Sequence, residues 1–147
     1  MINIEESINW SNKNWPNDRW PNFAFKELVC IETGISRMNP EFMDRLQRLR
    51  YSVGFPLLIT SGYRDITHSI EADKLSKGAT YPGSHSYGKA VDISCRADIA
   101  YTILGSALKH GFTGIGVAQS GANRFLHLDD MTSAERPDIQ RPFIWSY

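Results

Sequence analysis

Two histidines and one aspartate are spaced along the chain in a way that suits a metal site. His85 and Asp92 lie in the stretch 84–93, which reads S-H-x-x-G-x-A-x-D-I, and His127 follows within the stretch 125–129. Two imidazoles and one carboxylate can hold zinc and leave a fourth position open for water, which distinguishes a catalytic zinc from a structural one. These residue types therefore predict a zinc hydrolase with His85, Asp92 and His127 as the metal ligands.

Two predicted strands must position these side chains. Asp92 lies in a predicted strand over residues 90–95 and points away from the face used by its aliphatic neighbours, because strand side chains alternate between faces. In a second predicted strand, over 124–129, His127 and Asp129 share one face. If the two strands are neighbours, Asp92 and His127 come close enough to share one metal ion.

The spacing of His85 and Asp92 is a weak signal by itself, since a lone histidine is more often a hydrogen-bonded core or surface residue. Small residues surround His85, and among them Gly88 would let the loop turn tightly or approach the site closely. A globular domain that binds no metal, with structural histidines, is the alternative at this point.

The remaining pattern predicts an α+β fold with a small, mainly antiparallel sheet, helices packed on one face and the zinc site on the other. Asn39 and Pro40 are typical of a helix start, Gly54 of a helix end, and Asp98 of the cap of a later helix. The predicted helices span residues 40–53, 66–76 and 99–110, and the predicted strands span 55–60, 90–95, 114–118 and 124–129.

Length and composition bound the class of protein. The chain has 147 residues, which favours one domain, and we expect a monomer with an irregular N-terminal arm over 1–21 and an aromatic C-terminal tail over 131–147. We expect the arm to lie over the domain, with a partner-binding tail as the alternative. Its formal net charge of zero does not indicate nucleic acid as a partner. No apolar run approaches the roughly 20 residues of a membrane span, and the acidic start does not read as a signal peptide. We read the tail as packing back on the domain, or less favourably as a rim of the substrate groove.

Several motifs in order give the chain a resemblance to a known family. It resembles the zinc D-alanyl-D-alanine carboxypeptidase family, which includes phage cell-wall endopeptidases, over about residues 22–130. The matching segments are Ser61-Gly62-Tyr63-Arg64, Ser84-His85-x-x-Gly88-x-Ala90-x-Asp92-Ile93, Gly114-Ile115-Gly116-Val117, Phe125-x-His127-x-Asp129 and the lead-in over 22–30.

The resemblance implies roles for individual residues. His85, Asp92 and His127 would ligate Zn²⁺, and Arg64 would bind a carboxylate or carbonyl of the substrate, for which a guanidinium fork is suited. A structural salt bridge of Arg64 is the alternative. His68, in the following loop, is a candidate for a hydrogen bond to substrate, with a plain surface position as its alternative.

The general base departs from the family pattern. Many relatives carry an acidic residue three positions before the last zinc histidine, where this chain has Arg124, which accepts no proton at neutral pH. Asp129 is the nearest carboxylate on the correct face, either as the catalytic base or as an acceptor that orients a zinc histidine. Glu71 and Asp130 are weaker candidates.

Two functions follow as expectations. The first is a zinc-dependent peptidase of bacterial peptidoglycan stem peptides, expected to be an endolysin-like lysis protein of a phage or prophage. Such a protein would be made in the cytoplasm and act on the cell wall after release. The second is a non-catalytic, zinc-containing domain that binds cell wall or belongs to a virion, an alternative that Arg124 motivates.

Overall fold

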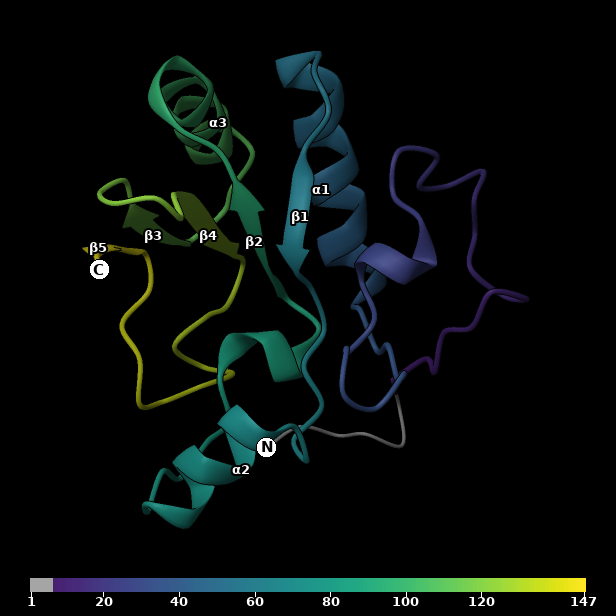
Figure 1. Ribbon diagram of the computed structural model, residues 1–147, viewed down its shortest axis with the longest axis vertical. Helices are drawn as coiled ribbons and strands as arrows, with labels where there is room; N and C mark the ends of the chain where they lie inside the picture. The colour runs from purple at the N-terminus through teal and green to yellow at the C-terminus, as the bar shows by residue number, and fades with distance from the viewer. Residues whose placement is uncertain (1–6) are drawn as a thin grey trace.

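The structure, a computed structural model, describes residues 7–147 and is built on one five-stranded sheet (Figure 1). The strands lie in the order β1-β2-β4-β3-β5. Every pairing is antiparallel except that of β3 with β5. The strand bounds are Leu58–Ser61 for β1, Ala90–Ser94 for β2, Gly114–Ala118 for β3, Phe125–Asp129 for β4 and Phe143–Ser146 for β5. The predicted α+β class with a mainly antiparallel sheet is confirmed.

Helix α1, residues Pro40–Val53, begins and ends where the sequence indicated. The Asn39 side chain accepts a hydrogen bond from the backbone N–H of Phe42 (2.9 Å), which satisfies a donor that the first turn leaves free. Gly54 ends the helix at a φ of 75°, a conformation that glycine adopts without strain.

Helix α3, residues Ala97–Lys109, packs against α1, and the two helices cover one face of the sheet (Figure 1). The predicted cap was wrong, because Arg96 occupies the N-cap position without a side-chain hydrogen bond and Asp98 lies in the first turn. A carboxylate there still interacts favourably with the positive end of the helix dipole. None of the helices within residues 7–147 combines the length and apolar character that a membrane crossing requires.

The hydrophobic core lies between these two helices and the sheet. Alternate residues of the two central strands, β2 and β4, are buried in it, as the period of two in the sequence predicted. The main contributors are Phe42, Leu46, Val91, Ile93, Ile103, Leu126 and Leu128, all of which are almost fully buried. The opposite face of the same strands is left for polar groups.

Helix α2, residues Ser69–Ser76, lies away from α1 and α3, at the opposite end of the molecule (Figure 1). It begins three residues later than predicted, because Nδ1 of His68 accepts a hydrogen bond from the backbone N–H of Ile70 (3.1 Å) and caps the helix. Two short 3-10 helices were not predicted: η1, residues Phe25–Glu27, and η2, residues Ser84–Tyr87.

The N-terminal arm packs on the domain over the part that the structure describes, as predicted. Three buried indole rings contact one another edge to face: Trp10, Trp15 and Trp20. The indole N–H of Trp20 donates to Asp44 of α1 (2.8 Å), so the cluster is tied to the main helix. Residues 1–6 of the predicted arm lie outside the described residues.

The C-terminal tail also packs back on the domain, but as a strand that the sequence analysis did not predict. Residues Phe143–Ser146 form β5, which pairs in parallel with the outer edge of β3. In Figure 1 the yellow end of the chain crosses below the sheet and returns along this edge. The tail thereby reaches the same sheet that carries the predicted metal ligands.

Candidate metal centre

The register of the sheet places one row of residues across the face opposite α1 and α3. Asp92 of β2 pairs with His127 of β4, His127 with Gly116 of β3, and Gly116 with Trp145 of β5. Ser61 of β1 lies beside Asp92 at an irregular point in the pairing. Paired residues on neighbouring strands project to the same side of a sheet, so this row forms the floor of a site.

His85 reaches this row from η2, immediately before β2. The short helix ends at Gly88, whose φ of 69° suits glycine, and a Cβ there would overlap the backbone carbonyl of Arg37. The carbonyl of Gly88 accepts a hydrogen bond from the backbone N–H of Asn39 at 2.9 Å. The tight turn expected at this position is therefore present, whereas the close approach of Gly88 is to the backbone of Arg37 and Asn39 and not to the metal centre.

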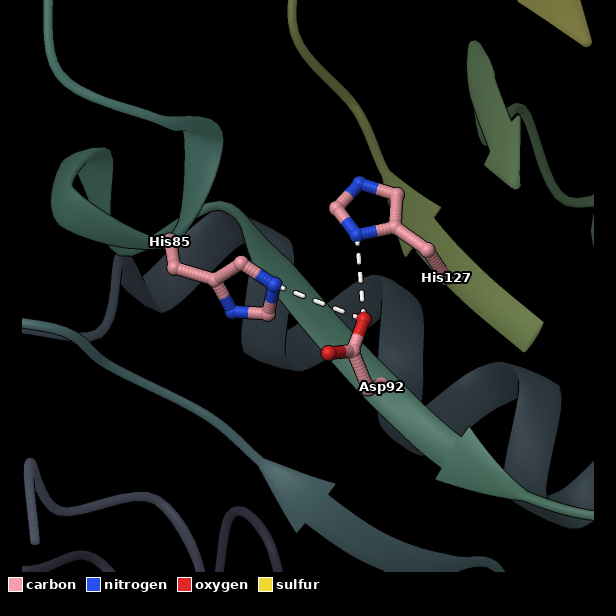
Figure 2. Close-up of side chains that lie close together, drawn as sticks. All are labelled: His85, Asp92 and His127. Atoms are coloured by element: carbon pink, nitrogen blue, oxygen red, sulfur yellow. Dashed lines mark hydrogen bonds and ion pairs between the residues drawn. The ribbon is translucent and has the colours of Figure 1, made fainter. Parts of the chain in front are cut away.

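The three predicted ligands converge in the structure, as Figure 2 shows. Oδ1 of Asp92 lies 3.4 Å from Nε2 of His85 and 3.1 Å from Nδ1 of His127. The three candidate ligand atoms all lie within 4.8 Å of one another. Two donors bound at 2.0–2.1 Å to one tetrahedral zinc are about 3.3 Å apart, so these separations and this set of N and O donors fit zinc.

Each of the two histidines uses one ring nitrogen in a hydrogen bond outside the centre and turns the other nitrogen toward it. Nδ1 of His85 lies 2.8 Å from the carbonyl oxygen of Gly62, so it can only donate and Nε2 is left as the ligand atom. Nε2 of His127 lies 2.8 Å from Oδ2 of Asp129, which leaves Nδ1 free to face Asp92. A carbonyl or carboxylate in this position fixes the tautomer and the orientation of a metal-binding histidine.

Asp129 has no exposed surface, and both of its oxygens are in contact with donors. Arg141 donates to it through Nε (2.9 Å to Oδ1) and through Nη2 (2.8 Å to Oδ2), and the backbone N–H of Met131 adds a bond of 3.2 Å. Burial would raise the pKa of this carboxyl, but His127 and Arg141 lower it to about 2. Asp129 is therefore a charged acceptor with its positions filled.

The electrostatics of the centre favour a carboxylate between two imidazoles. Burial opposes ionisation of Asp92, but hydrogen bonds and charge from His127 and His85 lower its pKa well below the usual range. Burial disfavours the charged form of His127, but the carboxylates of Asp129 and Asp92 raise its pKa overall. A cation at this point is therefore stabilised by two carboxylates, which suits a divalent metal.

Arg64 lies beside the centre and takes part in an ion pair with a buried partner. Nη1 is 3.2 Å from Oε1 of Glu71, whose side chain is fully buried, and Nη2 donates to Oγ of Ser61 at 3.3 Å. The guanidinium keeps partial exposure. The structural salt bridge considered for Arg64 is thus present, and it leaves the group on the edge of a cavity.

A groove lies along the outer edge of β1, and none of the three candidate metal ligands is among the residues that line it. It has a volume of about 570 Å³ and is lined by Ser61, Gly62, Arg64 and His68, among others. The carbonyl of Gly62 is the one that holds His85, so groove and centre share this residue. This volume is in the range of small-molecule and peptide sites.

The other residues considered from the sequence lie in different settings. His68 lines the groove, but its two ring nitrogens contact the backbone of Ile70 and the carboxylate of Glu32 (3.4 Å). Arg124 donates to the carbonyl of Gly121 (3.0 Å) within the hairpin turn. Asp130 is paired with Arg45 at 3.3 Å.

Two contributors to the site were missed in the sequence analysis, Arg141 and Trp145. The indole of Trp145 lies 5.1 Å from the ring of His127 and the guanidinium of Arg141 lies 5.1 Å from that indole. The signal was the pair of small residues Gly114 and Gly116, since a Cβ at Gly116 would come within 2.7 Å of Trp145. Glycines facing a predicted metal strand indicate that large groups occupy the space above them.

A His–Asp–His set with backing hydrogen bonds, on one face of a small α+β sheet, is the arrangement of a zinc-dependent hydrolase. A family model described as Peptidase M15 matches residues 21–129, so the chain belongs to the Peptidase M15 family of zinc peptidases related to D-alanyl-D-alanine carboxypeptidases. A search of curated proteins found no match. The resemblance seen in the sequence is confirmed, and membership indicates a zinc metallopeptidase with peptidoglycan as the substrate class.

Proposed function

We propose that this protein cleaves peptide bonds in the stem peptides of bacterial peptidoglycan, with His85, Asp92 and His127 as its zinc ligands. The observation that carries the proposal is the convergence of these three side chains, within 4.8 Å, at one point of the sheet face. Membership of the Peptidase M15 family supports the reaction class.

A zinc ion held there would supply a water nucleophile at neutral pH and polarise the carbonyl of the scissile bond. The protein's own groups hold the ligand atoms in place. Gly62 fixes the ring of His85, and Asp129 fixes the ring of His127. Asp92 contributes the negative charge between them.

The groove beside β1 is the proposed seat of the stem peptide. Arg64 lies on its wall with a guanidinium that is already oriented by Glu71, so little side-chain freedom is lost when it binds a carboxylate or carbonyl. His68 is proposed to contact the substrate from the same wall, because it lines the groove.

Asp129 is proposed to orient His127 rather than to act as the proton acceptor. Its carboxylate is fully buried and bound by Arg141, His127 and the backbone of Met131, whereas a general base must reach the proton it removes. Replacement Asp129→Asn separates the two roles. An orienting role predicts zinc affinity about 10- to 100-fold weaker. A catalytic base predicts normal zinc affinity and a loss of turnover alone.

The test of the proposed function combines the zinc content of purified protein with mass spectrometry of digested peptidoglycan. We expect about one zinc per chain, cleavage that stops on chelation, and loss of both in His127→Ala. The masses of the fragments then distinguish a carboxypeptidase from an endopeptidase. An active His127→Ala protein would contradict the ligand assignment.

A non-catalytic zinc domain that binds cell wall or belongs to a virion is the second candidate. Arg124 at the usual position of the base favours it, as does the saturated environment of Asp129. Zinc and wall binding without any new fragment would support this function over hydrolysis. The first proposal also places the action of this protein at the cell wall, as for the lysis protein of a phage. This placement rests on the phage endopeptidases of the family.

A further inference from the structure

Arg141 connects the C-terminal tail to one of the proposed zinc ligands. It lies beyond residues 21–129, the segment that the Peptidase M15 model matches. Its guanidinium binds Asp129 through two nitrogens, at 2.9 Å and 2.8 Å, and Asp129 in turn contacts Nε2 of His127 at 2.8 Å. A continuous chain of charged hydrogen bonds thus runs from the tail to the metal centre.

The side chains that form this series of hydrogen bonds are buried. The side chains of Arg141 and Asp129 are 8% and 0% exposed, so the surrounding protein restricts the movement of both. Buried bonds between a guanidinium fork and a carboxylate are directional and are stronger than neutral hydrogen bonds. Oδ2 accepts from both Arg141 and His127, so the guanidinium sets the oxygen on which the imidazole is oriented.

Trp145 provides a second connection between the tail and the same imidazole. Its ring lies 5.1 Å from the ring of His127 and 5.1 Å from the guanidinium of Arg141. Strand β5 carries this residue into the row that also contains Gly116, which leaves room for the indole. The tail therefore meets His127 both through hydrogen bonds and through a ring contact.

Without Arg141, Asp129 would be a fully buried carboxylate with a weakened set of donors. A buried charge that loses its partner is costly, and the carboxylate would have to move toward other donors. Such a movement alters the bond to Nε2 of His127, and with it the orientation in which Nδ1 faces the metal position. The effect of Arg141 on the metal is thus exerted through another residue.

From these contacts we infer that Arg141 is a positioning residue of the zinc site, through which the C-terminal tail sets the orientation of His127. The inference rests on the proposed function only in requiring that zinc binds at His85, Asp92 and His127. It assigns to the tail a part in metal binding that the family-matched segment does not supply.

The chain offers a matched control in the same tail. Arg136 binds Asp138 with the same two-pronged geometry, through Nε (3.0 Å) and Nη2 (2.7 Å). That pair contacts none of the proposed ligands within the described residues. Arg136→Ala therefore removes a fork of the same form, from a carboxylate that is more exposed than Asp129 and that, within residues 7–147, contacts none of the proposed ligands.

The experiment compares Arg141→Ala, Arg141→Lys and Arg136→Ala with the unaltered protein, by competition with a chelator for zinc and by the visible absorption of the cobalt-substituted form. We expect zinc affinity about 10- to 100-fold weaker in Arg141→Ala, with a changed cobalt spectrum, and an intermediate loss in Arg141→Lys, which keeps the charge without the fork. Arg136→Ala should match the unaltered protein.

Circular dichroism of the zinc-free proteins shows which variants fold. If Arg141→Ala does not fold, Arg141→Lys is compared with Arg136→Ala in its place. The inference is overturned if the folded Arg141 variants bind zinc as tightly as Arg136→Ala and give the same cobalt spectrum. An unaltered protein that binds no zinc would instead contradict the proposed function.

Discussion

At the scale of single residues, the candidate metal centre consists of the three proposed ligands and of the groups that hold two of them in place. His85, Asp92 and His127 were predicted from residue type and spacing, and the structure brings them together. The bonds behind them involve Gly62 and Asp129. A backbone carbonyl such as that of Gly62 carries no signature in the sequence, whereas the short spacing of His127 and Asp129 on one strand does.

Glu71 is a single buried charge that links Arg64, the proposed substrate-binding residue, to the stability of the fold. Its carboxylate accepts from Arg64 and Lys74, both at 3.2 Å, and from the backbone N–H of Gly83 at 2.8 Å. Burial alone would raise the pKa of Glu71, but these donors lower it below its ordinary value of 4.5. A lowered pKa in the folded state stabilises the fold above the unfolded pKa, and this contribution is lost as pH falls through the folded pKa.

We therefore expect Glu71→Gln to lower the free energy of unfolding by about 1–3 kcal/mol at pH 7. The difference from the unaltered protein should shrink as pH falls below about 4.5, the pH region of the unfolded carboxyl. Urea unfolding at pH 7, 5 and 3.5 measures it. Asp73→Asn, which removes an exposed pair with Lys77 on the same helix, should change stability by under about 0.5 kcal/mol. A difference that is constant across this pH range would exclude the linkage.

At the scale of elements, the sheet was predictable up to β4 and not beyond. Strands β2, β3 and β4 follow alternating or apolar runs that end at turn residues, and α1 has both a cap and a stop signal. Strand β5 has no such pattern, because three of its four residues are exposed and it pairs with the sheet on one side only. Its position depends on contacts between distant parts of the chain, such as Arg141 with Asp129.

Two glycines of β3, Gly114 and Gly116, leave room for the large side chains of Asp129 and Trp145 that lie over this strand. A Cβ on Gly114 would overlap the carboxylate of Asp129, which is held in place by Arg141 and His127. We expect Gly114→Ala to lower the free energy of unfolding by about 1–3 kcal/mol, as overpacking does, and to weaken zinc binding.

Gly105→Ala in α3 is the control, since nothing lies within 4 Å of its added Cβ. It should raise the free energy of unfolding by about 0.5–1 kcal/mol, because alanine is the better helix former. Chemical unfolding and chelator competition on both variants make the comparison. Equal effects of the two substitutions would show that the space above Gly114 is not occupied as described.

At the scale of the whole molecule, the N-terminal arm is part of the folded domain. Trp20 has no exposed surface, contacts the rings of Trp10 and Trp15, and donates to Asp44 of α1. The composition of the arm indicated packing but not its partner, because three tryptophans without a period fit several surfaces equally well. The contact with α1 is set by tertiary structure.

This packing predicts one cooperative transition, with tryptophan fluorescence and far-ultraviolet circular dichroism coinciding during urea unfolding. Trp20→Ala should lower the free energy of unfolding by about 3–5 kcal/mol, because a large buried side chain is removed. Tyr101→Ala, at a position that is 83% exposed, should stay within about 0.5 kcal/mol. A separate early fluorescence transition would mean that the arm unfolds independently.

The row from Asp92 through His127 to Gly116 has a consequence for how the chain avoids mispairing. A slip of one residue between β2 and β4 would pair Asp92 with Leu126 or Leu128, so that either Asp92 or His127 turns into the core and the aliphatic side chains of the slipped strand become exposed. Such a species loses both its apolar burial and the geometry that admits zinc. The metal therefore discriminates between correct and shifted strand alignments, and the fraction of refolded chains that retain zinc reports how many have paired their strands correctly.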